Sequence, residues 1–372
     1  MIRLMGETAA HVAAAAVESS VPGAVLAGGL GETTWITSAA GWADTTPRGS
    51  RPMLHDTLFD LASLTKVVAT LPLVLSLVAD GSVSLDDPVS AYLHGFTGGA
   101  RHKVTLRNLL THTSGLPATC ELWLRCGEPV EATATLCRLP LEAEPGTLVA
   151  YSDVGFILLG SVVEEVTGES LDAAFAERIS RPLALTRTRF GPLARGEEVA
   201  ATERRRDGTA WKGVVHDENA RFLGGVAGHA GLFSDAADMS RFAKWWISAD
   251  DGPVPAALRD TANRCGTGDL GGHRGLGWVC AGDQSYLPGR GWSAQAVSHT
   301  GFTGTSIALD PVTGMWVVLL TNAVHHGRDK RTVRKLREAV HSSLAIALGP
   351  KTWNSASERR DARMADRRLG AD

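Results

Sequence analysis

The sequence predicts an α/β (α+β) fold in which both ends of the chain build one sheet-containing domain and a mainly helical domain is inserted between them. Strand-like runs bounded by glycines occur near the N-terminus and again in the last third, whereas the middle carries apolar residues at helical spacing. At 372 residues, 44% of them hydrophobic, the chain is long enough for one large or two interlocked domains with substantial cores.

The N-terminal region predicts a helix followed by a β-hairpin. The alanine-rich residues 4–16 fit an ordinary helix, because Glu7 and His11 interrupt the apolar region that a signal peptide would need. Two strand-like runs follow at residues 24–27 and 34–38, and Gly28, Gly29 and Gly31 mark the turn between them.

The middle of the chain predicts four helices, over residues 63–79, 105–112, 154–166 and 171–179. The first stops at Gly81 and contains Pro72, which should kink it or remove one backbone hydrogen bond. The second ends at a Ser-Gly-Leu-Pro run, and the third ends at Gly168.

The last third begins with a glycine-rich loop and then predicts an amphipathic helix over residues 235–246. Candidate strands follow at residues 277–279, 296–299, 305–309 and 316–321, with a turn over residues 310–314 between the last two. A helix over residues 331–348 precedes a tail rich in Arg and Asp. We therefore expect an α/β domain over 1–65 and 190–350, a helical domain over 66–189, and a disordered tail over 351–372.

Composition argues against several classes of function. A formal net charge of −3 and a pI near 6.5, with no basic stripe interleaved with aromatic residues, argue against nucleic-acid binding. The longest apolar run, residues 67–79, is shorter than a membrane span, so we expect a buried helix, no membrane partner and a cytoplasmic protein. Five cysteines without paired spacing indicate neither a disulfide framework nor a metal site, and no motif indicates a cofactor. The sequence leaves the oligomeric state unknown.

Ser63 and Lys66 form the most informative pair in the sequence. Residues three apart share a helix face, so the Lys66 amine can reach the Ser63 hydroxyl. The hydroxyl would also lie at a helix start, where free backbone N–H groups favour developing negative charge. The pair predicts a nucleophile with its own base.

Two further motifs follow in the chain. Tyr151, in Tyr-Ser-Asp at a helix start, is either a packing residue or a proton carrier whose phenol pKa is lowered by a nearby ammonium. The run Ser-His-Thr-Gly-Phe-Thr-Gly-Thr at residues 298–305 reads as a strand whose glycines allow a ligand or another backbone to approach. His112, at a helix end, is predicted to be a structural hydrogen-bonding residue.

These three motifs, in this order, resemble those of the serine β-lactamase and penicillin-binding-protein superfamily: S-x-x-K, a second motif of S-D-N or Y-x-N type, and K-T-G. The class C-like branch of esterases, D-stereospecific peptidases and transacylases is the most similar, since residues 109–117 and 228–234 also resemble runs of that branch. The resemblance implies a β-lactamase/transpeptidase-like fold, with an antiparallel sheet flanked by helices and an inserted helical domain.

The resemblance also implies roles for individual residues. Ser63 would be the acylated nucleophile and Lys66 its base, which requires the pKa of Lys66 to fall from about 10.4 toward about 7 to 8. Tyr151 would pass a proton to the leaving group. The oxyanion would lie between the backbone N–H groups of Ser63 and Phe302. The implied substrate-binding residues are Asp153, His299, Thr300 and Gly301.

The chain departs from the superfamily pattern at two of these positions. Asp153 replaces an asparagine, and its charge near Lys66 would hold the lysine protonated and oppose its use as a base. Either Asp153 therefore points toward substrate, or Tyr151 takes more of the base role. His299 replaces a lysine, and a histidine is mostly neutral at pH 7, which weakens recognition of the carboxylate of a β-lactam. We therefore expect a small-molecule ester or amide substrate that lacks this requirement.

The predicted function is a serine hydrolase or acyltransferase that forms an acyl-enzyme on Ser63. Two alternatives within that chemistry remain open: a transacylase of small-molecule biosynthesis with an amine or alcohol acceptor, and a D-Ala-D-Ala-type carboxypeptidase or β-lactamase. A metal hydrolase that uses the histidines is an alternative outside it. A fourth alternative, from a different class, is a catalytically silent ligand-binding homologue.

Overall fold

A computed structural model describes residues 14, 17, 21–47, 49–289 and 291–348. Except for residue 14, the helix expected over 4–16 lies outside these residues, as does the tail expected to be disordered over 351–372.

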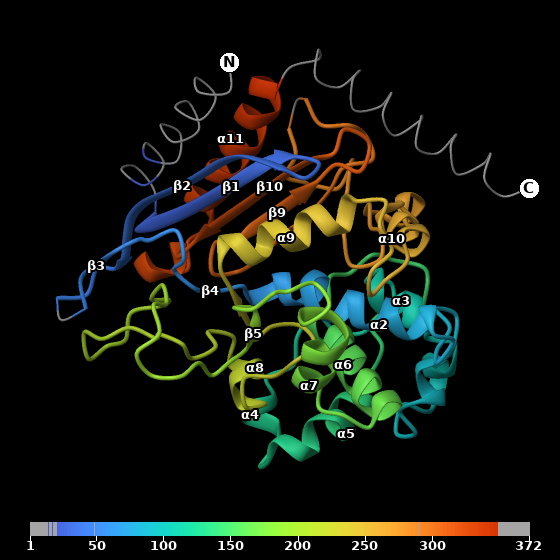
Figure 1. Cartoon of the computed structure of the whole chain (residues 1–372). Helices are drawn as coiled ribbons and strands as arrows, with labels where there is room; N and C mark the ends of the chain where they lie inside the picture. The colour runs from blue at the N-terminus through green and yellow to red at the C-terminus, as the bar shows by residue number, and fades with distance from the viewer. Residues whose placement is uncertain (1–13, 15–16, 18–20, 48, 290, 349–372) are drawn as a thin grey trace, which may run out of the picture.

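The predicted antiparallel sheet is present and combines strands from both ends of the chain (Figure 1). Its order is β3-β2-β1-β10-β9-β8-β7, and each neighbouring pair is antiparallel. The strands are β1 (Gly23–Leu30), β2 (Thr33–Asp44), β3 (Arg51–Pro52), β7 (Val279–Cys280), β8 (Val297–Thr300), β9 (Ser306–Leu309) and β10 (Met315–Thr321). Strand β1 joins the halves, because it pairs with β2 on one side and with β10 on the other.

Helices cover both faces of this sheet, which explains why β1 is buried along almost its whole length. Successive side chains of a strand point to opposite faces. Val25 and Ala27 belong to the main core, which includes α9 (Ala236–Ile247), whereas Ala24 and Leu26 pack in a second core with α11 (Lys330–Leu348). The sheet is therefore the middle layer between α9 and α11.

The chain between β4 and β5 is helical, as the apolar spacing predicts (Figure 1). Its α-helices are α2 (Leu71–Ala79), α3 (Leu106–Leu110), α4 (Leu122–Arg125), α5 (Ala132–Cys137), α6 (Asp153–Thr167) and α7 (Leu171–Phe175); α8 (Glu218–Phe222) and α10 (Ala256–Asn263) follow later in the chain. Helix α6 shows why the expected bounds hold. The Ser152 hydroxyl accepts a hydrogen bond from the N–H of Gly155 at its start, and Gly168 ends it with φ 69°.

The helix expected over residues 63–79 is present: the chain is helical without a break from Ala62 to Ala79, and it is irregular just before Pro72, where a kink or a lost hydrogen bond was expected. The segment is a 3₁₀ turn (Ala62–Leu64), a π-helical turn (Lys66–Thr70) and then α2. The N–H of Leu71 bonds to the carbonyl of Lys66, five residues back, immediately before Pro72. Because proline has no N–H, it is compatible with the first turn of a new α-helix and not with the interior of an old one.

The same segment, Ala62–Ala79, is almost entirely buried in the core. Residues Ala62–Ala79 have the length and hydropathy of a membrane span, and they are the one stretch of described residues that does. However, 83% of this stretch is buried inside the protein, as expected for a core helix.

A second, three-stranded sheet brings distant segments beside Ser63. Strand β4 (Phe59–Asp60), just before the 3₁₀ turn, pairs with β6 (Leu232–Ser234), which also pairs with β5 (Arg189–Phe190). The loop before β6 is thereby placed next to the start of the central helical segment. The proposed domain boundaries remain a prediction.

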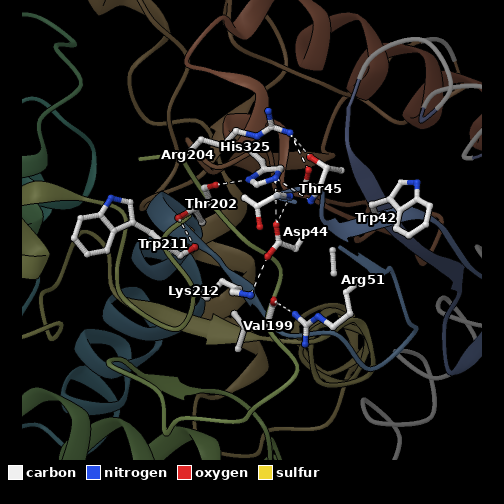
Figure 2. Close-up of polar contacts among 12 residues, drawn as sticks. Trp42, Asp44, Thr45, Arg51, Val199, Thr202, Arg204, Trp211, Lys212 and His325 are labelled. Atoms are coloured by element: carbon white, nitrogen blue, oxygen red, sulfur yellow. Dashed lines mark hydrogen bonds and ion pairs between the residues drawn. The ribbon is translucent and has the colours of Figure 1, made fainter. Parts of the chain in front are cut away.

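A polar cluster links the end of β2 to later segments of the chain (Figure 2). The buried Asp44 carboxylate contacts the Lys212 ammonium at 2.8 Å. His325 accepts a hydrogen bond from the Thr45 N–H and donates one to the Thr202 carbonyl. Burial alone would raise the pKa of Asp44, but hydrogen bonds from Lys212 and Thr46 and the Lys212 charge outweigh it and hold that pKa below its usual value.

We expect Lys212→Met to destabilise the protein by about 1 to 3 kcal/mol at pH 7, because it leaves the buried Asp44 carboxylate without its cation. A carboxyl whose pKa is lowered by folding stabilises the fold above its unfolded pKa, near 4, and loses that contribution as pH falls through the folded pKa. In urea unfolding, the free energy of unfolding of the variant should therefore fall less on acidification than that of the unmodified protein. The double variant Asp44→Asn, Lys212→Met should recover part of the loss; equal stability of Lys212→Met and the unmodified protein would contradict the prediction.

Candidate active site

Ser63 lies in the 3₁₀ turn between β4 and the π-helical turn that carries Lys66. Ala62, the residue before it, has φ 47°, a conformation that residues with a Cβ rarely adopt. The Lys66 Nζ atom lies 3.1 Å from the Ser63 Oγ atom, so the pair predicted from sequence spacing is in hydrogen-bonding contact. Both side chains belong to the same tightly wound segment.

Lys66 is fully buried and has an oxygen partner in each of three different segments. Besides Ser63, its Nζ atom contacts Oδ1 of Asp153 at 2.7 Å and donates to the carbonyl of His229 at 3.0 Å. Two of these contacts are hydrogen bonds, to Ser63 and His229, and the third is an ion pair with Asp153. The amine is thereby fixed in one place.

The expected lowering of the Lys66 pKa is wrong. Burial does lower the pKa of a lysine, but the charge of Asp153, with hydrogen bonds to Asp153 and Tyr151, outweighs burial and raises the Lys66 pKa above its ordinary value. Of the two arrangements that the sequence left open for Asp153, the structure shows the carboxylate turned toward Lys66. Lys66 is thus an ammonium at neutral pH.

Tyr151 lies beside both members of the pair. The centre of its ring is 5.1 Å from Nζ of Lys66. Burial raises the pKa of the phenol, and the Lys66 charge, together with contacts to Lys66 and Ser63, only partly offsets this. The expected lowering of the Tyr151 pKa is therefore also wrong, and the phenol is protonated at neutral pH.

The third motif, predicted as a strand over residues 298–305, is the end of β8 and the turn that leads to β9, and this turn is bonded to the residues just before Ser63. The hydroxyls of Thr303 and Thr305 donate to the carbonyls of Asp60 and Leu61. A Cβ atom on Gly301 would lie 2.3 Å from the Leu61 carbonyl oxygen, so only glycine allows this approach. Gly301 and Phe302 are consequently held beside Ser63.

His299, on β8, is buried, and its imidazole is neutral, as expected for a histidine at pH 7. Burial, followed by the positive charges of Lys66 and Arg274, holds its pKa well below the ordinary value. Its Nδ1 atom lies 3.0 Å from the Thr300 carbonyl, which can only accept, so the ring proton is on Nδ1. Nε2 is then a hydrogen-bond acceptor, and it has no partner among the described residues.

One cavity of about 530 Å³ brings the predicted residues together, except Lys66, which is buried behind its wall. Its lining includes Ser63, Tyr151, Asp153, His299, Thr300, Gly301 and Phe302. It also includes groups that the motifs do not identify, namely Asp217 and the arginines Arg274, Arg328 and Arg337.

The arginines differ in how their charge is balanced. Arg274 pairs with Asp283, and Arg328 pairs with Glu203 and Glu218. Arg337 is buried and donates to two carbonyl oxygens, of Gly301 and Thr305, but forms no ion pair with a described carboxylate. Burial lowers the Arg337 pKa to about 10, so it remains charged. A lone arginine on a predicted helix carries no sequence signal for such a position.

Asp217 and His229 form a second polar pair at the cavity. Nε2 of His229 lies 2.8 Å from Oδ1 of Asp217, which also accepts from the N–H of Ala220 at the start of α8. The pair fixes the loop whose His229 carbonyl holds Lys66. The sequence signal for it is the glycine-rich run at residues 228–234.

Comparison with known proteins identifies the family of this chain. A family model described as Beta-lactamase matches residues 8–341. A putative D-alanyl-D-alanine carboxypeptidase of Escherichia coli K12 is 37% identical over 303 residues, covering 72% of this chain and 70% of that protein. An N-acetylmuramyl-L-alanine amidase of Bacillus subtilis is 34% identical over 314 residues, covering 72% of this chain and 68% of that protein.

Solved structures of similar fold include enzymes of different named activities. EstCE1, described as a hydrolase with promiscuous acyltransferase activity, superposes with a TM-score of 0.76 at 24% identity, covering 92% of this chain and 99% of its own. The simvastatin synthase LovD of Aspergillus terreus superposes with a TM-score of 0.72 at 21% identity, covering 93% and 98%. At these identities the likeness concerns the fold. Because the family model covers nearly the whole chain and close relatives cover over two thirds of it, the chain belongs to the beta-lactamase family.

Proposed function

We propose that this protein is a serine hydrolase or acyltransferase that forms an acyl-enzyme on Ser63 from a small ester or amide. The observation that carries the proposal is the 3.1 Å contact between Lys66 Nζ and Ser63 Oγ beside Tyr151, with Ser63 and Tyr151 open to one cavity. A nucleophile in contact with a proton-transfer partner, itself held by a third group, is the arrangement that covalent catalysis requires.

The charge state of Lys66 determines how the proton of Ser63 would leave. As an ammonium, Lys66 has no lone pair, so it accepts a proton only if it gives one away. Asp153 Oδ1, at 2.7 Å, is the group to which it gives that proton. We therefore assign a relay in which the Ser63 proton passes to Lys66 as a Lys66 proton passes to Asp153, with the number of protons conserved.

The remaining steps use groups that line the same cavity. Tyr151, protonated at neutral pH, would donate its proton to the leaving group and recover one from the incoming water, amine or alcohol. The backbone N–H groups of Ser63 and Phe302 would hold the oxyanion, and each such donor contributes on the order of 10²- to 10³-fold in rate.

His299 supports a substrate without a carboxylate at the position of the family lysine. Its unpartnered Nε2 atom is an acceptor, which favours an O–H or N–H donor and repels a carboxylate oxygen. Thr300 and Gly301 would complete this side of the binding site. Hydrolysis and acyl transfer use the same residues, and the named activities of EstCE1 and LovD make either outcome plausible for this fold.

Arg337 favours a second candidate, a D-Ala-D-Ala-type carboxypeptidase, the activity named for the Escherichia coli relative. A buried guanidinium without a carboxylate partner is stabilised by an anion, and Arg337 lines the cavity. The terminal carboxylate of a peptide would supply that anion. This candidate differs from the first in the charge of the substrate and not in the acyl-enzyme chemistry.

A fluorophosphonate should label Ser63 in the intact protein. Mass spectrometry of the peptide that contains Ser63 is expected to show one adduct, whereas Ser63→Ala should show none and should lose ester hydrolysis. Product analysis with added amine or alcohol acceptors would then separate hydrolysis from transfer. An equal adduct in Ser63→Ala, or a protein that binds ligands without ever being labelled, would contradict the acyl-enzyme proposal and favour a silent ligand-binding homologue.

Asp153→Asn should move the acidic limb of the kcat/KM profile to higher pH. Without the Asp153 charge, burial dominates and lowers the Lys66 pKa, so the free amine becomes the base and activity rises as Lys66 deprotonates. In the unmodified protein the relay uses the Lys66 ammonium, so activity does not depend on Lys66 losing its proton to solvent. Stopped-flow or steady-state rates on a p-nitrophenyl ester from pH 4 to 10 measure the two profiles; coincident limbs would rule out the relay.

A p-nitrophenyl ester should be turned over with a higher kcat/KM than nitrocefin, which carries a carboxylate. His299→Lys should bring the two kcat/KM values closer together by raising the value for nitrocefin, because an ammonium that attracts the nitrocefin carboxylate replaces an acceptor atom. An acyl-D-Ala-D-Ala peptide, assayed by D-alanine release, separates the two candidates. If that peptide or nitrocefin is preferred over neutral esters, the second candidate replaces the first.

A further inference from the structure

His112 is buried, does not line the cavity and is held in an uncommon backbone conformation. It follows α3 with φ 57°. Histidine adopts this left-handed region more readily than branched residues do, but a residue other than glycine that does so is uncommon. Conformations of this kind persist where the surrounding contacts require them.

The contacts of His112 converge on Tyr151 from both sides. The N–H of Ala150 donates to the His112 carbonyl at 2.8 Å, and the N–H of Ser152 donates to its ring Nδ1 atom at 3.1 Å. The backbone N–H groups of the two residues on either side of Tyr151 are thus bonded to one residue. The His112 ring also lies against the Tyr151 ring, with centroids 4.5 Å apart.

The protonation state of His112 is suited to this role. Because Nδ1 accepts from a backbone N–H, the ring proton lies on Nε2 and the ring is neutral. Burial, followed by the charges of Arg274 and Lys66, lowers its pKa well below the ordinary value, so the acceptor at Nδ1 persists through the neutral range. The ring also packs against Phe156, in the first turns of α6.

We propose that His112 is a positioning residue that fixes the Tyr151 phenol against Ser63 and Lys66 by holding the peptide N–H groups on either side of it. This inference rests on the proposed function, because it concerns the proton that Tyr151 gives to the leaving group. A phenol that departs from its place by a fraction of an ångström transfers that proton poorly. His112 itself touches neither substrate nor reacting atoms.

Leaving-group dependence tests this role. An alkyl ester needs a proton on its departing oxygen, whereas p-nitrophenolate and the fluoride of a fluorophosphonate leave without one. A misplaced Tyr151 should therefore lower kcat/KM for the alkyl ester far more than for the p-nitrophenyl ester. General acid catalysis contributes about 10²- to 10⁴-fold, so we expect a loss of about 10²-fold on the alkyl ester and below about tenfold on the other.

His112→Gly and His112→Asn form a matched pair for this measurement. Both residues adopt positive φ readily, and both lose the imidazole ring. Only asparagine retains an acceptor, its Oδ1 atom, the same number of bonds from Cα as Nδ1. His112→Gly should show the selective loss on the alkyl ester, and His112→Asn should restore most of it. Fluorophosphonate labelling of Ser63 should proceed in both variants.

Two controls keep this test separate from the proposed function. Tyr151→Phe should reproduce the leaving-group dependence of His112→Gly, and Ser63→Ala should be inactive on every substrate; if either fails, the proposed function is at fault. If both controls behave as expected and His112→Gly lowers kcat/KM equally for the two esters, or lowers it for neither, the positioning role is wrong. If thermal unfolding shows that His112→Gly does not fold, His112→Gln replaces it. The amide oxygen of glutamine lies one bond further from Cα, too far to accept from the Ser152 N–H. Equal kinetics of the Gln and Asn variants would then refute the proposal.

Discussion

The geometry of the site depends on one buried ammonium. Lys66 is fully enclosed, and its three oxygen partners come from its own turn, from the start of α6 and from the loop before β6. A buried charge is tolerated only when its donors are satisfied and a counter-ion is near. Satisfying Lys66 therefore fixes the relative positions of the three segments, and Ser63 and Tyr151 are placed as a consequence.

The identity of the counter-ion determines the chemistry that the site can perform. With asparagine at position 153, burial would be the dominant influence and the amine would lose its proton readily. With Asp153, the nearby negative charge outweighs burial and the amine keeps it. Under the proposed relay, the site would use an ammonium paired with a carboxylate in place of a neutral amine base. His299 changes the opposite wall in a comparable way, because it replaces a cation with a neutral acceptor.

Much of this was predictable from sequence because local signals carried it. Short-range spacing identified Ser63 with Lys66, and capping residues gave the bounds of α6 within a residue or two. The pKa directions of Lys66 and Tyr151 were not predictable, since they depend on burial and on a contact between residues far apart in the chain. Arg337 was missed for the same reason: a helix position shows that a residue is helical, not that its guanidinium lies beside a cavity and lacks a carboxylate partner among the described residues. The irregularity at Pro72 was expected as a kink or a lost hydrogen bond, and the structure gives it the form of a π-helical turn immediately before the α-helix that contains the proline.

The two glycine-containing runs that support the family resemblance have a physical reason to exist together. The run at residues 109–117 and the residue after it hold the segment before α6, since the carbonyls of Pro117 and Ala118 accept from Ser152 Oγ and from the Asp153 N–H. The run at residues 228–234 approaches the same helix so closely that a Cβ on Gly228 would lie 2.0 Å from the Phe156 carbonyl oxygen. The first run thus sets the position of the Asp153 carboxylate that holds Lys66, and the second supplies the His229 carbonyl that accepts a hydrogen bond from Lys66. Motifs that touch no substrate can therefore be as diagnostic of the reaction as the nucleophile itself, because the buried ammonium requires both.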